Sequence, residues 1–300
     1  MFALRTYLTC PSFLFALTEL LTITKMGDSK LNPPFMHIYP PDFDKNRAVE
    51  LGTLVDAAYA QYKQRASVGD TWQPAGYQLH RVLQAKETGV LVPFGFVATK
   101  GTDAYVVMRG TVTPLEWLDD ATIVPVPFAL DWGNTTQGFK AVYNQLSPTI
   151  IQAIDALKSA NAFVDLYVTG HSLGAALAHL AAADIFAQRK VPAISYTLAG
   201  PRTGDPAFAA AFVHAGLKTW RIFNTEDIVP TLPLSTPDLV PANLGLNGTT
   251  GEMLLKLFLQ HAAVNRGGWL YEHLEIPIAV TFQKGSIADN HNCTNLYGAL

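Results

Sequence analysis

The feature that most constrains the fold is the sequence Gly170-His171-Ser172-Leu173-Gly174, which comes directly after the apolar run 166–168. A serine on a tight bend between a strand and a helix has a strained backbone, so the positions two before and two after it need almost no side chain. Gly170 and Gly174 meet this requirement. Residues 175–183 are mainly Ala and Leu, which favour a helix that packs close to a sheet. This order of strand, turn and helix is typical of hydrolases that present a nucleophilic serine, although any α/β protein can contain a glycine-rich turn.

Short apolar runs alternate with helical patterns through the second half of the chain. Residues 165–168, 194–198 and 220–223 are such runs, and residues 275–282 supply a last strand. Apolar runs of this length, separated by helices, are typical of parallel strands that are buried on both faces. We therefore expect an α/β fold with a mostly parallel, doubly wound sheet, helices on both faces, and an active site at the carboxyl ends of the strands.

The first half of the chain predicts elements that precede this alternation. Apolar residues at helical spacing over 51–62 indicate a first helix, and residues 92–99 and 104–108 indicate two strands of a hairpin. Residues 139–160 look helical. Because proline is favourable only in a first helical turn, Ser147-Pro148 indicates either a restart or a kink in that helix.

Composition limits the class of protein. The 300 residues are 49% hydrophobic and only 15% charged, against about 25% charged in an average soluble domain, so the chain has a large core or leaves some apolar surface exposed. Both properties suit an enzyme that contacts lipid. The net charge of −3 offers no basic surface for nucleic acid. The two cysteines, Cys10 and Cys293, are too few for a zinc site and are expected to be free thiols. Catalysis by a nucleophilic serine, through an acyl-enzyme, needs neither a metal nor an organic cofactor.

The N-terminal residues differ from the rest. Residues 1–25 are mostly apolar after Arg5, as in a secretory signal or a membrane-associating tail, but Pro11 and Glu19 interrupt the run and no A-x-A cleavage site follows. We expect residues 1–30 to be an N-terminal extension and residues 31–300 to be a single catalytic domain. The protein is expected to be secreted, or cytoplasmic if the first 25 residues are not a signal.

The nucleophile needs a carboxylate that orients its histidine, and this acid should lie on a turn just after a strand. In hydrolases built on this fold the chain order is serine, acid, histidine. Asp227 follows the predicted strand 220–223 and lies 55 residues after Ser172. Glu226 is its neighbour and rival, and position alone favours Asp227 only weakly.

The base must be a histidine that follows the acid near the carboxyl ends of the strands. His179 and His214 precede Asp227 and are excluded by the chain order. His273 opens the last predicted strand, and nine residues at about 3.3 Å each would place it some 30 Å from the catalytic edge. His291 leaves that strand at the correct end and is the expected base, with His261 as a distant second.

Three further segments make the chain resemble the class 3, fungal-type lipase family of the α/β hydrolases, from about residue 50 to the C-terminus. The first is the segment 107–111, which ends in Arg109-Gly110-Thr111 and is followed by Trp117 and Asp120. In that family an Arg-Gly-Ser/Thr turn supplies half of the oxyanion hole, and a tryptophan and an aspartate follow at this spacing. The resemblance therefore gives Thr111 a role as oxyanion donor and Asp120 a role in supporting the Thr111 hydroxyl.

The other two segments are Pro201-Arg202-Thr203-Gly204, similar to a Pro-Arg-x-Gly segment of the family, and residues 227–233, similar to its acid motif. The second of these selects Asp227 over Glu226. The chain departs from the family after the last strand, where a compact His-x-x-Tyr is usual. Here His291 is followed by a looser segment that reaches tyrosine only at Tyr297.

The resemblance implies a serine hydrolase that cleaves carboxylic esters, above all a triacylglycerol lipase acting on acylglycerols at a lipid–water interface. In this mechanism His291 deprotonates Ser172, Asp227 orients His291, and the backbone N–H groups of Thr111 and Leu173 bind the oxyanion. An esterase for soluble esters, of the feruloyl esterase or phospholipase A1 type, is the alternative. A catalytically silent lipid-binding fold is a third hypothesis.

Two segments are candidates for covering the site. Residues 112–120 are amphipathic and are expected to form a lid whose Trp117 and Leu118 contact substrate. A static surface helix is the alternative for this lid segment. Residues 235–266 look like an insertion between the acid and the last strand, and the apolar stretch 253–260 within it suits either a core helix or a cap over the acyl pocket.

Overall fold

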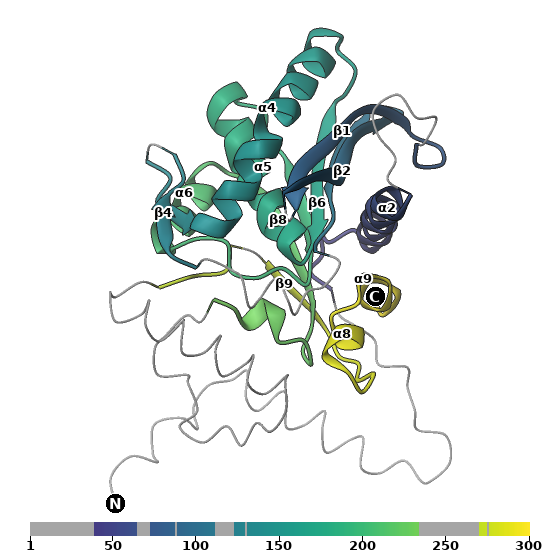
Figure 1. The fold of residues 1–300 in the computed structure, drawn as a ribbon, viewed down its shortest axis with the longest axis vertical. Coiled ribbons are helices and arrows are strands. Elements are labelled where there is room, and N and C mark those ends of the chain that lie inside the picture. The colour runs from purple at the N-terminus through teal and green to yellow at the C-terminus, as the bar shows by residue number, and fades with distance from the viewer. Residues whose placement is uncertain are drawn as a thin grey trace, which may run out of the picture. The chain divides into compact units, whose positions relative to one another are not determined.

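The computed structural model describes residues 39–64, 73–87, 89–111, 123–129, 131–233, 270–274 and 276–300 (Figure 1). The chain divides into two compact units, and all elements given below belong to the second, Asp42–Leu300. The predicted extension 1–30, with Cys10, lies outside the described residues. Within the described part, no helix has the length and apolar character needed to cross a bilayer.

A seven-stranded sheet forms the centre of this unit in the described part of the chain. Its strand order is β1-β2-β3-β6-β7-β8-β9. The first three strands pair antiparallel, and every pair from β3 to β9 is parallel. The strands are β1 (Gln78–Glu87), β2 (Val90–Lys100), β3 (Asp103–Met108), β6 (Asp165–His171), β7 (Ile194–Leu198), β8 (Lys218–Asn224) and β9 (Ile276–Val280). The predicted mostly parallel sheet is thereby confirmed, and β1 extends the predicted hairpin by one edge strand.

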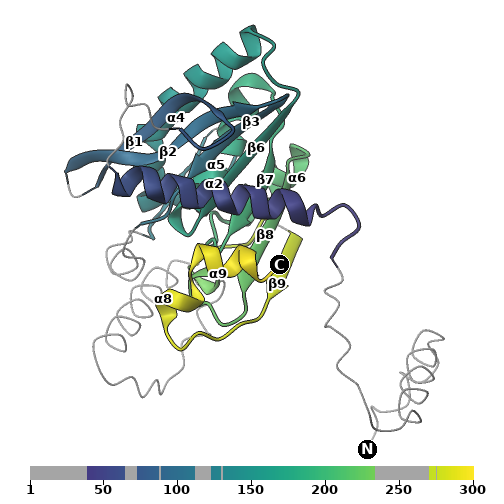
Figure 2. The same ribbon diagram turned by 90° about the vertical axis from the view of Figure 1, so that its right-hand side faces the viewer.

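Helices lie on both faces of the sheet (Figure 2). On one face α4 packs against α5, which follows the serine, and α2 and α9 pack together against the other face. Pro148 lies inside α4, so the helix neither ends nor restarts there. The helices are α2 (Lys45–Lys63), α4 (Gln137–Ser159), α5 (Leu173–Arg189), α6 (Pro206–His214), α8 (Ile287–Asn290) and α9 (Cys293–Gly298). A short 3-10 helix, η1 (Val229–Thr231), and a hairpin of β4 (Pro125–Pro127) and β5 (Asn134–Thr136) complete the described elements.

The core explains the alanine-rich sequence after the serine. Every residue of α5 from Leu173 to Ala183 is buried, because this helix lies between the sheet and α4. Small side chains allow the helix axis to approach both neighbours, while Leu177 and Leu180 fill the remaining space. This close packing fixes the first turn of α5, and with it the position of Ser172, against the strands.

Candidate active site

Ser172 occupies a sharp turn between the end of β6 and the start of α5. Its backbone angles, φ of 57° and ψ of −126°, lie in a region that residues other than glycine rarely adopt. A Cβ on Gly170 would lie 2.1 Å from the carbonyl oxygen of Gly174, and a Cβ on Gly174 would lie 2.4 Å from the carbonyl oxygen of Met108. The two glycines are therefore required by close backbone contacts, as the sequence pattern predicted, and the turn is more than a flexible glycine-rich loop.

His291 and Asp227 meet at the carboxyl ends of the strands. The Nδ1 of His291 lies 2.6 Å from Oδ2 of Asp227, and both side chains are fully buried. The other carboxylate oxygen of Asp227 accepts a hydrogen bond of 3.0 Å from the backbone N–H of Val229. A carboxylate only accepts, so Nδ1 carries the proton in this pair, and Nε2 of the neutral ring has a free lone pair. The arrangement orients a histidine that can accept a proton.

Two buried asparagines hold the loops that carry this pair, and the sequence analysis did not identify them. Asn224, the last residue of β8, donates through Nδ2 to the carbonyl oxygens of Phe282 at 3.0 Å and Asn290 at 3.1 Å. Asn290 donates in turn to the carbonyl oxygen of Glu226 at 3.3 Å. The loop before His291 is thereby tied to the loop that carries Asp227. Asparagine at the end of a buried strand was the available signal, but its partners are distant in sequence.

Three buried polar atoms at this site have no hydrogen-bond partner among the described residues. They are Oγ of Ser172, Nε2 of His291 and Oγ1 of Thr111. Buried side-chain polar atoms are nearly always paired, because leaving one unpaired costs about 1–3 kcal/mol. Unpaired groups of this kind, gathered at one edge of the sheet, are typical of a site whose partner is a substrate.

The two backbone segments expected to donate to an oxyanion lie next to Ser172. A Cβ on Gly110, the residue before Thr111, would lie 2.8 Å from Cβ of Ser172, so the Thr111 turn packs directly against the serine. Leu173 is the first residue of α5, where a backbone N–H has no acceptor within the helix and the helix dipole is positive. The backbone N–H groups expected to bind an oxyanion therefore lie on segments that flank Ser172.

A buried arginine fixes the turn that leads to Thr111. Arg109 donates to the carbonyl oxygens of Pro93 at 2.9 Å and Gly110 at 2.7 Å, and its guanidinium lies 3.2 Å from the carboxylate of Glu87. The guanidinium also lies 4.3 Å from the ring centroid of Phe94. Arginine in this motif therefore acts as a structural anchor, because its fork of donors binds several acceptors at once.

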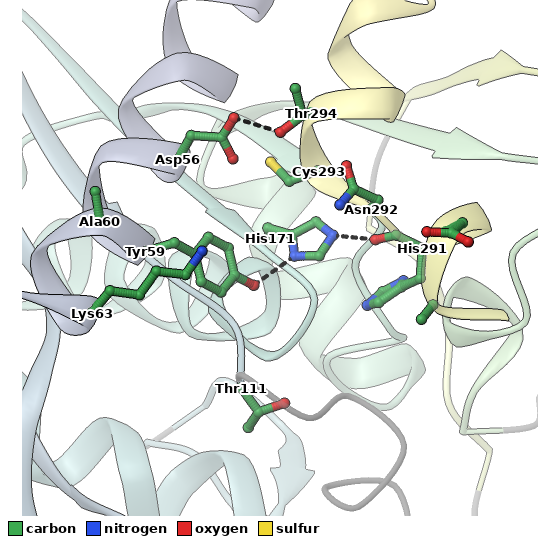
Figure 3. A pocket seen from close by; sticks show the side chains of 12 residues that line it. Asp56, Tyr59, Ala60, Lys63, Thr111, His171, His291, Asn292, Cys293 and Thr294 are labelled. Atoms are coloured by element: carbon green, nitrogen blue, oxygen red, sulfur yellow. Dashed lines mark hydrogen bonds between the residues drawn. The ribbon is translucent and has the colours of Figure 1, made fainter. Parts of the chain in front are cut away.

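A cavity of about 470 Å³ opens beside these residues, between α2 and the segment that contains α8 and α9 (Figure 3). Thr111 and His291 line it, which connects the cavity to the reactive groups. His171, Tyr59 and Cys293 form part of its wall, and Cys293 is a free, buried thiol. The cavity therefore borders both the expected base and one residue expected to bind the oxyanion.

His171, the residue before the serine, is hydrogen-bonded on both ring nitrogens. Its Nδ1 lies 2.8 Å from the hydroxyl of Tyr59, and its Nε2 lies 2.7 Å from the carbonyl oxygen of His291 (Figure 3). Burial, and then the neighbouring charge of protonated His291, hold the pKa of His171 well below its usual value. His171 is therefore a neutral side chain at neutral pH.

The other candidate histidines in the described part of the chain have hydrogen-bond partners other than Asp227. His179 bonds Thr203 through Nδ1 at 2.8 Å, and His214 bonds the carbonyl oxygen of Ala210. The prediction that a nine-residue strand separates His273 from the catalytic edge by some 30 Å was wrong. The strand β9 has five residues, not nine, and begins after His273, whose Nε2 lies 2.8 Å from the carbonyl oxygen of Pro230, close to the acid loop.

Several predicted positions lie outside the described residues. They are the lid segment 112–120 with Trp117, Leu118 and Asp120, the insertion 235–266, and the rival base His261. Their predicted roles therefore stay predictions.

Comparison with known proteins finds lipases and a phospholipase among the relatives. The model of the family "Lipase (class 3)" matches residues 105–236. A lipase from Rhizomucor miehei is 36% identical over 135 residues, which are 43% of this chain and 37% of that protein. Secreted mono- and diacylglycerol lipase A from Penicillium cyclopium is 35% identical over 47% of each chain, and phospholipase A1-II 4 from Oryza sativa subsp. japonica is 32% identical over 46% of this chain and 42% of the relative. The chain thus spans less than half the length of these curated relatives.

Structural similarity extends further along the chain. The solved structure of Rhizomucor miehei triacylglyceride lipase superposes with a TM-score of 0.56 and 27% identity, covering 63% of this chain and 74% of that one. The mostly parallel sheet and the serine turn are those of the α/β-hydrolase fold. Residues 105–236 match the model of the class 3 lipase family, and the resemblance found in the sequence motifs is thereby confirmed.

Proposed function

We propose that this protein is a serine hydrolase that cleaves carboxylic esters, and that Ser172, His291 and Asp227 are its catalytic triad. The observation that carries the proposal is the buried 2.6 Å contact between His291 and Asp227, beside a serine whose Oγ is buried without a partner among the described residues. A serine hydroxyl is a weak nucleophile until a histidine accepts its proton. This site supplies the histidine, its orienting carboxylate and the strained serine turn.

Each residue has a defined task in the reaction. Nε2 of His291 accepts the proton of Ser172 as Oγ attacks the ester carbonyl carbon, and Asp227 stabilises the imidazolium that forms. The imidazolium then gives this proton to the leaving alkoxide, which departs as the alcohol and leaves an acyl group on Ser172. Water, deprotonated by His291, attacks the acyl-enzyme and releases the carboxylic acid.

The oxyanion is bound by the backbone N–H groups of Thr111 and Leu173. The packing of Gly110 against Ser172 and the position of Leu173 at the first turn of α5 support this assignment. The unpaired Oγ1 of Thr111 offers a third donor. One such donor contributes about 10²- to 10³-fold in rate, since it binds the charge that develops in the transition state.

The substrate class proposed is an acylglycerol at a lipid–water interface. The names of the relatives support it, because the Rhizomucor and Penicillium proteins are a triacylglyceride lipase and a mono- and diacylglycerol lipase. The low charged fraction of the chain agrees with contact with lipid. We also propose that the protein is secreted, as the Penicillium relative is by its name, and that residues 112–120 act as the lid.

A second candidate is an esterase for other esters, since the rice relative is named a phospholipase A1. Hydrolysis of triacylglycerols, phosphatidylcholine and p-nitrophenyl esters from acetyl to palmitoyl, with and without an emulsion, separates the two. A lipase should prefer long acyl chains and gain activity at the emulsion surface. A maximum at acetyl or butyryl esters that ignores the emulsion contradicts the lipase proposal.

The triad itself is tested with Ser172→Ala. This variant should retain the fold and lose almost all ester hydrolysis, because it removes the hydroxyl that attacks the ester carbonyl. Unchanged hydrolysis by Ser172→Ala would refute the triad. Absence of hydrolysis in the unmodified protein toward every ester class would favour the lipid-binding hypothesis.

A further inference from the structure

A continuous chain of hydrogen bonds joins the turn before Thr111 to the loop of His291. The backbone N–H of Gly110 donates to the hydroxyl oxygen of Tyr59 at 3.1 Å, and this hydroxyl contacts Nδ1 of His171 at 2.8 Å. Nε2 of His171 contacts the carbonyl oxygen of His291 at 2.7 Å. The chain therefore begins at the segment that carries one expected oxyanion donor and ends at the backbone of the expected base.

The two ends of this series of hydrogen bonds determine which atom carries the proton in each bond. A backbone N–H only donates and a backbone carbonyl only accepts. Nε2 of His171 must therefore carry a proton to donate to His291, which leaves Nδ1 as an acceptor. The Tyr59 hydroxyl then donates to Nδ1 and accepts from Gly110. One arrangement of protons satisfies all three bonds, and it requires a neutral His171, in agreement with its lowered pKa.

Close packing leaves the side chains of Tyr59 and His171 little room to move. His171 is 3% exposed, and its ring centroid lies 4.6 Å from that of His291. A Cβ on Gly110 would lie 2.7 Å from the Tyr59 hydroxyl. A shift of the Gly110 backbone would therefore displace Tyr59, and a shift of Tyr59 would release His171 from its only described donor.

We propose that Tyr59 and His171 are positioning residues that couple the oxyanion turn to the catalytic base. They do not touch the reacting atoms. They hold the Thr111 N–H and Nε2 of His291 in the relative geometry that the tetrahedral intermediate needs. This inference rests on the proposed function, because it assigns the coupled segments their roles in ester cleavage.

Steady-state hydrolysis by variants of the full chain tests this positioning role. We expect His171→Leu and Tyr59→Phe each to lower kcat by about 10- to 100-fold with KM nearly unchanged, since a displacement of about 1 Å has an effect of this size on a transition state and little on binding. His171→Gln should restore most of kcat, because its amide offers an acceptor for Tyr59 and a donor for His291 in one planar group.

The double variant distinguishes coupling from two unrelated structural defects. Because both side chains belong to one hydrogen-bond chain, Tyr59→Phe should have little further effect on kcat in the His171→Leu background. Multiplying losses, or equal kcat for His171→Gln and His171→Leu, would refute the proposal. A changed KM or a lower melting temperature without a loss of kcat would also count against the proposal. Those are the changes that a purely structural role predicts.

A matched control removes a buried tyrosine hydroxyl elsewhere. Tyr143 on α4 donates to Asp184 at 2.8 Å, and Asp184 lies about 18 Å along α5 from Ser172 at 1.5 Å per residue. Tyr143→Phe should lower stability and leave kcat unchanged. Ser172→Ala distinguishes the two proposals. If it abolishes hydrolysis while His171→Leu and Tyr59→Phe behave as wild type, the proposed function stands and only the positioning role fails.

Discussion

The buried neutral His171 should give the protein a measurable loss of stability at mildly acidic pH. In the folded protein its pKa is held well below the usual value by burial and by the charge of His291 when that ring is protonated. In the unfolded chain it titrates near pH ~6.5 like an ordinary histidine. Below that pH the unfolded state binds a proton that the folded state does not, so folding becomes less favourable as the pH falls.

The size of the effect follows from linkage for one proton. Between pH 7.5 and 5.5 the protein should lose on the order of 1 kcal/mol of unfolding free energy through His171, and the loss should grow further at lower pH for as long as the folded ring stays neutral. His171→Gln lacks this titration. Its stability relative to wild type should therefore improve by these amounts as the pH is lowered.

Urea unfolding of both proteins at half-unit pH intervals measures the difference. Carboxylates with lowered pKa values, such as Glu50 beside Lys100 and Tyr77, also reduce stability in acid, but they are present in both proteins and cancel in the difference. His171→Gln keeps a donor and an acceptor, so the comparison isolates the titration. Parallel stability curves from pH 7.5 to 4.5 would refute the conclusion that His171 is neutral in the folded state.

Three other changes test the site. Gly174→Ala places a Cβ 2.4 Å from the Met108 carbonyl, so unfolding free energy measured in urea should fall by about 1–3 kcal/mol and hydrolysis should be lost; near-normal values would contradict the packing argument. Thr111→Val keeps the shape of the side chain and the backbone N–H. If Oγ1 binds the oxyanion, kcat should fall by about 10²-fold, and an unchanged kcat would show that Oγ1 is not a donor to the oxyanion. Asp227→Asn should lower kcat by about 10⁴-fold at constant melting temperature, because the amide favours the wrong tautomer of His291, and a loss below tenfold would exclude Asp227 as the orienting acid.

Sequence patterns predicted the parts of the fold that depend on local periodicity. Residues 194–198 coincide with β7, and the hairpin of β2 and β3 was expected from two apolar runs. The edge strand β1 was not predicted, because its sequence is polar and only Val82, Leu83 and Ala85 are buried. Its place in the sheet is fixed by pairing with β2, which a local pattern does not reveal.

Some parts of the candidate site could likewise be predicted from local sequence, and others could not. Ser172 and its glycines form one contiguous motif whose geometry is set by neighbouring residues. The meeting of His291 with Asp227 follows from chain order and strand direction. Tyr59 had no sequence signal beyond a helical face, and its contact with His171 spans 112 residues. Contacts of this kind depend on how α2 packs on the sheet, which requires the assembled structure.

The hydrogen bond between His171 and the His291 carbonyl joins residues that are 120 positions apart. The ribosome therefore makes the serine turn well before it makes His291. At 5–20 residues per second a ribosome makes the serine turn about 6–24 s before it reaches the base. During that interval the growing chain holds the proposed nucleophile without its proposed proton acceptor. On the proposed mechanism, ester hydrolysis therefore cannot begin until β9 and the loop that follows it have been made.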